Sequence, residues 1–399
     1  MDQPEHAKKG CSMNAIKKII RIIGYFVEAV EYIILYPIAK MVYGHRHIHI
    51  FAERGTDARD NGYHLYRYYR EKHPEVEVYY IITKNSADRP KVAELGNVVN
   101  RGSLKHHLLF IAAEYKISTH IMGYSPNIDF YIRFADRMRV KGYRIFLQHG
   151  VIPNDLPALH RDKTNLDIFV CGAKPEFDFV SNGFGYQNGE VKYTGLARYD
   201  ALHNVELKKQ ILCMPTWRKY LKYDANIHIE QSEYVKKWNG LINHPELISA
   251  LRNHGLKLIF YPHYEMQEHI SAFQSCCDEV VIADFKNYDV QQLLKESQLL
   301  ITDYSSVFFD FAYMGKPVIY YQFDKQRFFA EHYAKGYFDY ETMGFGEVVQ
   351  QENTAIEVIL EHIAHQFAMG SEYQRRIDGF FPLHDQDNCK RIFDEIEKL

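Results

Sequence analysis

Short apolar runs alternate with helix-like segments through most of this chain of 399 residues. Such an alternation indicates strands that are connected by helices, which pack as a parallel, doubly wound sheet. The expected strands of a first sheet are 47–52, 76–82, 115–121, 143–148 and 166–172. The expected strands of a second sheet are 209–215, 256–262, 279–285, 298–303 and 317–322. The sequence therefore predicts an α/β fold of two Rossmann-type domains.

The predicted domains meet near a Gly-rich segment, 181–200, which we expect to carry the crossing from one sheet to the other. We place an amphipathic helix in residues 1–44, an N-terminal Rossmann-like domain in 45–203 and a C-terminal one in 204–399. Two such domains that face a cleft would bind ligands at the carboxyl ends of their strands.

Composition excludes several classes of protein. Hydrophobic residues make up 46% of the chain and charged residues 25%, which is the balance of a folded globular protein. The formal net charge of −3 argues against a general nucleic-acid binder, which needs a basic surplus. The six cysteines form no CxxC pair, so the sequence predicts neither a zinc site nor a disulfide framework, and it suits a reducing compartment.

The N-terminal segment carries an apolar stripe at helical spacing, formed by Ile16, Ile20, Ile23, Val27, Val30 and Ile34. Charged residues interrupt it, and its longest uncharged run is the eight residues 32–39. A spanning helix needs about 20 mostly apolar residues. Basic residues near its start favour a helix that lies on an anionic membrane surface. A helix packed on its own domain is the second interpretation, and a membrane span is the third.

The segment 298–321 carries the strongest chemical signal. An apolar strand leads into Asp303, Tyr304, Ser305 and Ser306, and a helical pattern follows. Serine hydroxyls and free N–H groups at a helix start can bind an anion. The same residues can equally be plain N-caps, with Asp303 or Ser305 as the capping residue.

Four further segments place polar side chains after expected strands. Thr216 and Arg218 follow the strand 209–215, and an arginine there can bind phosphate or form a salt bridge. His263 and His149 follow strands of different domains, so they could converge on one cleft, one taking a proton and the other supporting phosphate charge. The crossing segment adds two charged residues, Arg198 and Asp200.

Two patterns resemble metal motifs but are discounted. His45, His47 and His49 alternate, and we interpret them as the solvated face of a strand. The DxD tripeptide at 385–387 follows no strand. We expect no bound metal and no cofactor.

Taken together, these segments resemble the CDP-glycerol glycerophosphotransferases, the primases and polymerases of teichoic acid. The resemblance rests on LLITDYSSVFFDFAYMGKPVIYYQFD, MPTWR, YPH, TGLARYD and the HG of LQHG, which lie along the chain in the order seen in that family, with FFPLHDQDNCKRIFDEI near the end. It covers roughly residues 140–397 and is weaker over 45–140.

The resemblance implies a GT-B-like fold with an N-terminal acceptor domain and a C-terminal CDP-donor domain. It implies transfer of glycerol or ribitol phosphate from CDP-glycerol or CDP-ribitol to a membrane-linked acceptor, with release of CMP and without a metal. His149 would be the base, Arg218, His263, Ser305 and Ser306 would hold the pyrophosphate, and Asp303 and Asp310 would shape the loop. The enzyme would be peripheral, on the cytoplasmic face of the cell membrane.

One departure bears on the acceptor. The family usually has Trp-His-Gly-Thr-Pro-Leu-Lys around the base, whereas residues 148–154 read QHGVIPN. The alternative function is a GT-B glycosyltransferase that uses a nucleotide sugar. A third hypothesis is a non-catalytic module that binds a nucleotide or a glycan.

Overall fold

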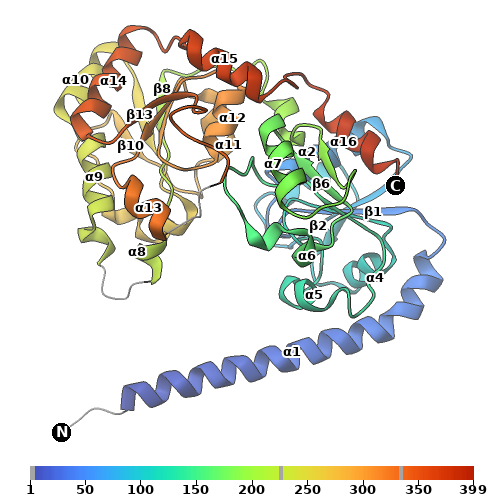
Figure 1. Cartoon of the computed structure of the whole chain (residues 1–399). Coiled ribbons are helices and arrows are strands. Elements are labelled where there is room, and N and C mark those ends of the chain that lie inside the picture. Colours follow the sequence, from blue (N-terminus) through green and yellow to red (C-terminus); the bar gives the residue numbers. More distant parts are fainter. Residues whose placement is uncertain (1–4, 224–227, 332–335) are drawn as a thin grey trace. The chain divides into compact units, whose positions relative to one another are not determined.

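The computed structural model describes residues 5–223, 228–331 and 336–399 and contains two parallel sheets with flanking helices (Figure 1). The strands are β1 Ile48–Ala52, β2 Glu77–Ile82, β3 Val98–Asn100, β4 Tyr115–Ser118, β5 Tyr143–Phe146, β6 Ile168–Cys171, β7 Val191–Tyr193, β8 Gln210–Cys213, β9 Lys257–Phe260, β10 Val280–Ile282, β11 Leu299–Thr302, β12 Val318–Tyr321 and β13 Gly346–Val349. The α-helices are α1 Glu5–Tyr43, α2 Asn61–Lys72, α3 Arg89–Glu94, α4 Leu104–Ala112, α5 Ile128–Phe134, α6 Arg161–Thr164, α7 Lys174–Gly183, α8 Lys219–Tyr223, α9 Glu233–Ile242, α10 Pro245–His254, α11 Val290–Glu296, α12 Val307–Tyr313, α13 Lys325–Glu331, α14 Glu352–Ala364, α15 Ser371–Phe380 and α16 Asn388–Ile396. The 3₁₀-helices are η1 Pro157–Leu159, η2 Ala197–Ala201, η3 Ile229–Gln231 and η4 Tyr264–Ala272.

Both sheets have the strand order of a Rossmann fold. The first runs β3-β2-β1-β4-β5-β6-β7 and the second runs β10-β9-β8-β11-β12-β13. In each sheet the strand order changes direction beside the strand that comes first in the chain, β1 or β8. Polar residues that follow the strands of a parallel sheet lie together at its carboxyl edge. The predicted fold class, α/β with two Rossmann-type sheets and an N-terminal helix, is confirmed.

The described residues form two compact units by their internal contacts. Unit 1 comprises Met1–His149, Arg161–Val170 and Cys389–Leu399, and unit 2 comprises Gly150–His160 and Cys171–Asn388. The predicted division of the chain at residue 203 stays a prediction.

Each strand that the sequence predicts is present, usually shortened by one to three residues at its ends. Three further strands, β3, β7 and β13, were not predicted. They are three or four residues long and mix polar with apolar side chains, so they carry no continuous apolar run. β7 lies within the segment that we expected to be only a crossing.

Unit 1 has a core between its sheet and the helices α1, α4 and α5. Tyr32 and Ala39 of α1 are buried in it together with Phe110 and Tyr131. The opposite face of α1 is covered by nothing in the described chain and carries exposed apolar side chains. Figure 1 shows α1 as a long helix that runs past α4 and α5.

His49 corrects one interpretation of the sequence. The residue is only 3% exposed and its ring packs on Tyr69 and Tyr115, with ring centroids 5.4 and 4.2 Å away. Burial lowers the pKa of His49 to about 4. β1 lies inside a sheet that is covered on both faces, so every residue of this strand is buried and none lines a solvated face.

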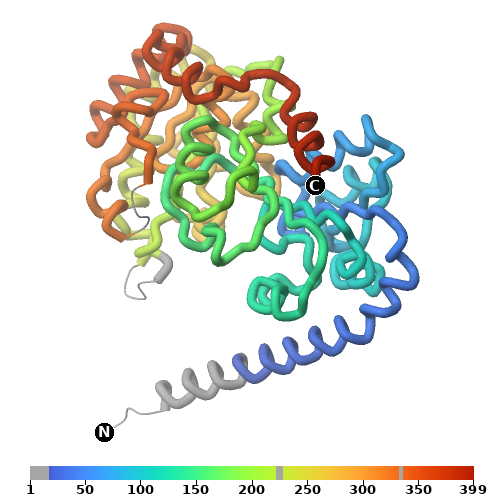
Figure 2. The backbone as a smooth tube through the Cα atoms, turned by 45° about the vertical axis from the view of Figure 1, so that its right-hand side comes forward, coloured from blue at the N-terminus to red at the C-terminus, as the bar shows by residue number. Residues whose placement is uncertain are grey.

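The end of the chain completes unit 1. Phe393 of α16 stacks on His73 at the end of α2, with ring centroids 3.7 Å apart, and it also contacts Tyr69. Tyr143 Oη donates a hydrogen bond to the carbonyl of Leu399. Figure 2 shows the dark red C-terminal segment ending beside the blue strands and helices of unit 1.

Candidate functional site

His149 follows β5 on a turn that two amide side chains hold in place. The preceding residue, Gln148, has a positive φ of 59° and donates a hydrogen bond of 2.6 Å from Nε2 to Val170 O. Asn61, the first residue of α2, donates from Nδ2 to Gln148 O at 2.9 Å. A left-handed backbone at a non-glycine residue is costly and persists where its surroundings enforce it. The exposed imidazole of His149 therefore stands on a fixed turn.

His120 supports His149 from the neighbouring strand. It follows β4, and its ring stacks on that of His149, with centroids 5.0 Å apart and an interplanar angle of 16°. Burial, with smaller effects of His149 and Arg54, lowers the pKa of His120 to about 3. His120 is therefore neutral near pH 7, and the imidazole of His149 beside it is exposed.

Ser305 and Ser306 lie in unit 2, between β11 and α12. Ser306 is the N-cap residue of α12 but makes no side-chain capping bond. Neither serine hydroxyl has a hydrogen-bond partner in the described chain. Gly150 contacts this site, since a Cβ atom on it would lie 3.5 Å from Ser306 Oγ and 3.7 Å from Arg198 Nη2. Capping of α12 by the side chain of Asp303 or Ser305 is not observed, since the N-cap position is Ser306 and Asp303 accepts hydrogen bonds from Thr216 N and Tyr304 N instead. Anion binding stays a prediction.

Arg218 is enclosed by acidic and aromatic side chains of unit 2. Its side chain is 1% exposed and lies 2.8 Å from Asp303 Oδ2 and 2.6 Å from Asp324 Oδ2. Although burial alone would lower it, the pKa of Arg218 is raised by these two carboxylates. Asp303 also accepts hydrogen bonds from the backbone N–H groups of Thr216 and Tyr304. This network fixes the loop that leads to the two serines.

Thr216 lies on the same network. Its N–H binds Asp303, and its carbonyl accepts a 2.7 Å hydrogen bond from Arg218 Nη1. Its hydroxyl is buried and has no hydrogen-bond partner in the part of the chain that the structure describes. A buried hydroxyl without a partner is costly and would gain from a bound acceptor.

Arg198 and Asp200 have carboxylate and amide partners. Arg198 Nε and Nη2 each lie 2.7 Å from an oxygen of Asp310 on α12, and both side chains are buried. Asp200 accepts hydrogen bonds from the N–H and the Nδ2 of Asn388 at 2.9 and 2.7 Å. The first pair orients α12, and the second fastens the C-terminal segment to the crossing segment.

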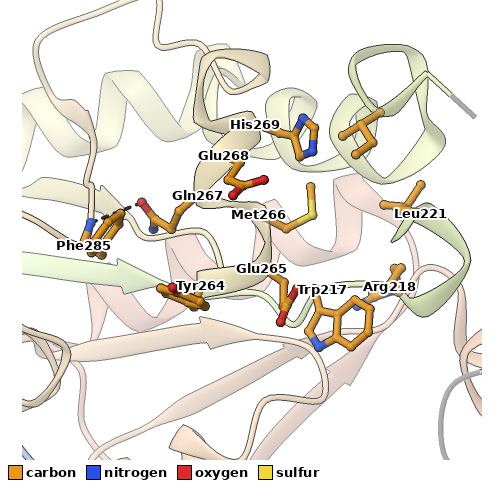
Figure 3. Close-up of a pocket in the computed structure, with 11 residues that line it drawn as sticks. Trp217, Arg218, Leu221, Tyr264, Glu265, Met266, Gln267, Glu268, His269 and Phe285 are labelled. Atoms are coloured by element: carbon orange, nitrogen blue, oxygen red, sulfur yellow. Dashed lines mark hydrogen bonds between the residues drawn. The ribbon is translucent and has the colours of Figure 1, made fainter. Parts of the chain in front are cut away.

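His263 follows β9 beside a pocket of about 490 Å³ (Figure 3). Its Nδ1 accepts a hydrogen bond from Glu265 N at 3.2 Å, and its ring lies 6.4 Å from that of Trp217. The pocket lies beyond the carboxyl ends of β8, β9 and β10, and it is lined by Trp217, Arg218, Leu221, Ile229, Tyr264, Glu265, Met266, Gln267, Glu268, His269 and Phe285. Its aromatic walls suit a planar heterocycle and its polar groups suit hydroxyls.

The sequence analysis did not single out the aromatic residues Tyr264 and Phe285. They are 62% and 42% exposed, and their rings meet edge to face at 5.8 Å. Gln267 belongs to η4, and its Oε1 accepts a hydrogen bond from Phe285 N (Figure 3). Tyr264 comes two residues after the expected strand 256–262, and Phe285 is the last residue of the expected strand 279–285. A large aromatic residue at the carboxyl end of an expected strand is the signal that could have identified them.

Metal chemistry has no candidate site among residues 5–223, 228–331 and 336–399, since no three His, Cys, Asp or Glu side chains gather there. The expectation of a metal-independent reaction stays a prediction.

Comparisons with known proteins agree with the resemblance in the sequence. The family model of CDP-glycerol:poly(glycerophosphate) glycerophosphotransferase matches residues 35–398. The minor teichoic acid biosynthesis protein GgaB of Bacillus subtilis is 35% identical over 371 residues, which are 90% of this chain and 40% of that protein. The teichoic acid poly(glycerol phosphate) polymerase of the same species is 24% identical over 98% of this chain and 54% of its own length. This chain thus spans about half the length of these relatives.

Solved structures share the fold. The wall teichoic acid polymerase TagF has a TM-score of 0.67 at 17% identity, with 97% of this chain and 98% of that chain covered. The UDP-GlcNAc 2-epimerase of Neisseria meningitidis has a TM-score of 0.51 at 10% identity, with 89% and 100% covered. The two neighbours support a GT-B-like fold.

Proposed function

Because this chain belongs to the CDP-glycerol:poly(glycerophosphate) glycerophosphotransferase family, a family of transferases of teichoic acid biosynthesis, we propose that it transfers glycerol phosphate from CDP-glycerol. The acceptor is a hydroxyl group of a membrane-linked glycan or teichoic acid polymer, and CMP is the second product. The family match over residues 35–398 carries this proposal. CDP-ribitol is the second candidate donor.

The proposed reaction is a phosphoryl transfer from the donor pyrophosphate. The acceptor oxygen forms a bond to the β-phosphorus, the bond from that phosphorus to the bridging oxygen breaks, and CMP leaves. His149 takes the hydroxyl proton, for which its exposed position on a fixed turn is suited. Such a transition state gains more from charge neutralisation and positioning than from covalent catalysis.

The donor binds unit 2 in this proposal. The hydroxyls of Ser305 and Ser306 and the buried hydroxyl of Thr216 bind phosphate oxygens, and His263 supports their charge. The nucleoside occupies the pocket between Trp217, Tyr264 and Phe285. Arg218, Arg198 and Asp200 act on the donor mainly through the loop, the helix and the segment that they fix, because each already has partners.

CMP release tests the function. Purified protein is incubated with CDP-glycerol or CDP-ribitol and an acceptor lipid extract, and the nucleotide products are separated. We expect CMP from the wild type, a loss of at least about a hundredfold in His149→Ala, and no loss in His254→Ala, an exposed histidine of α10.

Two outcomes would contradict the proposal. A nucleoside diphosphate released from a nucleotide sugar would indicate the alternative glycosyltransferase. Binding of CDP-glycerol without turnover, unchanged in His149→Ala, would indicate a binding module.

We propose a peripheral location on the cytoplasmic face of the membrane, and helix α1 supports the contact with a membrane. Residues Lys18–Tyr43 are long and apolar enough to cross a bilayer, which alone is weak evidence for a span. The stripe residues Ile20, Ile23, Val27, Val30 and Ile34 are all exposed, while the opposite face packs on unit 1. Because one face stays with the protein, we propose that α1 lies along the membrane surface with the other face in contact with lipid.

A further inference from the structure

Two arginines at the carboxyl edge of the first sheet have no carboxylate partner. Arg54 follows β1 after Glu53, and Arg101 follows β3 directly. All hydrogen bonds of their side chains in the described chain go to a neutral imidazole and a carbonyl, and neither side chain forms an ion pair there. Arg54 is exposed, whereas Arg101 is partly buried. A cationic side chain that is partly buried without an anion is unfavourable unless a ligand supplies the charge.

Arg101 is held in one position by the loop after β1. Its Nη1 donates a 2.6 Å hydrogen bond to Arg54 O, and its stem crosses Gly55, where a Cβ atom would lie 2.6 Å from Arg101 Cδ. Gly55 also has a φ of +80°, so both the backbone conformation and the close approach of Arg101 favour glycine at this position. Burial lowers the pKa of Arg101, yet its guanidinium stays charged at any physiological pH.

Arg54 connects this position to His149. Its Nε donates to His120 Nε2 at 3.1 Å, which makes the Nδ1 of that neutral ring the protonated nitrogen, 3.0 Å from Thr119 Oγ1. The face of the same ring stacks on His149. The two remaining guanidinium nitrogens of Arg54, on an exposed side chain, are therefore available next to the candidate base.

Acidic residues nearby are engaged elsewhere. Glu53 accepts backbone hydrogen bonds from Arg59, Asp60 and Tyr63 at the start of α2, and Asp57 accepts one from Arg54 N. Asp88 pairs with Arg59. None of them forms an ion pair with the guanidinium of Arg54 or Arg101 in the described chain, so this edge of unit 1 carries two arginines without a carboxylate partner, and Arg54 reaches His149 through His120.

We propose that Arg54 and Arg101 form an anion subsite that binds a phosphate group of the acceptor. Arginine N–H groups match phosphate oxygens in geometry and charge. The preferred acceptor then already carries a phosphate near its attacking hydroxyl, so that the enzyme extends a phosphate-bearing chain in preference to a neutral glycan. This inference rests on the proposed function for the identity of the ligand, while the subsite itself can be tested without turnover.

The binding test uses glycerol 3-phosphate and glycerol as probes, in calorimetric titrations of the full chain without donor. We expect glycerol 3-phosphate to bind the wild type, glycerol not to bind, and affinity to fall about tenfold in Arg54→Gln and in Arg101→Gln. Arg67→Gln is the matched control, because Arg67 lies on α2 and pairs with Glu71. Equal affinity in all variants would overturn the subsite.

The kinetic test compares a phosphate-bearing and a neutral acceptor on the same lipid, with CMP release as readout. In both variants we expect KM for the phosphate-bearing acceptor to rise about tenfold, KM for CDP-glycerol to stay constant and the rate with the neutral acceptor to change little. A rise in KM for CDP-glycerol would assign the arginines to the donor, and a loss of binding to phosphatidylglycerol vesicles alone would assign them to lipid; either overturns the proposal.

Different results would contradict the proposed function and the arginine subsite. If the wild type releases no CMP from either donor, the proposed function fails, whereas titration with glycerol 3-phosphate still reports on the subsite. If CMP is released but Arg54→Gln and Arg101→Gln leave both the titration and the acceptor KM unchanged, the subsite fails and the function stands.

Discussion

The guanidinium of Arg218 lies between the carboxylates of Asp303 and Asp324 and near four aromatic rings, at 5.1 to 5.7 Å from their centroids. From the sequence, an arginine just after a strand can be a phosphate ligand or a member of an ion pair. Two aspartates that are 85 and 106 residues away decide between these arrangements, and no local pattern reveals them.

Removing the Arg218 charge is expected to destabilise unit 2. Arg218→Met leaves two buried carboxylates without a counter-charge, so the free energy of unfolding should fall by about 3–5 kcal/mol. Chemical denaturation measures this, with Arg252→Met as control, because Arg252 pairs with Glu279 at an exposed site and should cost less than about 1 kcal/mol. If Arg218→Met and Arg252→Met lower the free energy of unfolding by similar small amounts, the buried ion pairs of Arg218 contribute nothing to stability.

Buried histidines predict a loss of stability in acid. Burial lowers the pKa of His106 to about 3, and its two ring nitrogens bind Gly102 N and Tyr124 O as a neutral imidazole. The ordinary pKa is near 6.5, so between pH 3 and 6.5 the unfolded chain binds more protons than the folded one, and stability falls as the pH falls. The slope is on the order of 1.4 kcal/mol per pH unit for this residue.

Urea denaturation between pH 7 and pH 4.5 checks that slope. His106→Gln should reduce the pH dependence, and His47→Gln should not, because His47 is exposed beside Glu114. If both variants keep the slope of the wild type, other groups cause it.

At the scale of elements, α1 has two apolar faces, of which one is buried and the other is exposed. The face of Tyr32 and Ala39 completes the core of unit 1, whereas the face of Phe26 and Ile33 is exposed. Deleting residues 1–43 would uncover that core, so point substitutions on the exposed face separate lipid contact from folding.

Substituting the exposed face should abolish membrane binding and leave folding intact. We expect the wild type to float with vesicles of phosphatidylglycerol and phosphatidylcholine, and Phe26→Glu/Ile33→Glu to remain at the bottom of the gradient. The two residues are 70% and 65% exposed, so the melting temperature should change little. Leu207→Glu, at an exposed leucine of unit 2, is the control. Flotation of the double variant would contradict a lipid contact of α1.

The elements themselves were largely readable from the sequence. Runs such as 76–82 and 317–322 are apolar because parallel strands are buried on both faces, and each is a strand in the structure. β3 and β13 were not predicted, because three or four residues of mixed polarity show no hydrophobic periodicity. Only their pairing with β2 and β12 defines them as strands. The solvated face assigned to His49 was wrong for a related reason, since alternation does not reveal burial on both faces.

At the scale of the whole molecule, the candidate residues come from distant segments. Ser305 and Ser306 stand out in the sequence because they are contiguous. Arg54, Arg101 and His120 do not, because the order β3-β2-β1-β4-β5 alone brings their strand ends to the same edge as that of His149. A reader of the sequence would need this order before recognising the four as neighbours.

Chelation tests the metal-free mechanism of the complete protein. We expect CMP release from CDP-glycerol to continue at an unchanged rate after dialysis against EDTA, because serine, threonine, histidine and arginine side chains supply the charge neutralisation in our proposal. The rate with and without added Mg²⁺ measures this. Loss of activity in EDTA that Mg²⁺ restores would show that a metal ion takes part.

The packing of α16 on α2 has a consequence for synthesis. Unit 1 takes most of its residues from the first half of the chain, but Phe393 and Leu399 are among its contacts. During translation the surface around Tyr69 and His73 therefore lacks its contacts with α16 until residues 389–399 have emerged from the ribosome, after the residues of unit 2. The nascent chain thus gives chaperones a long interval in which to bind that surface.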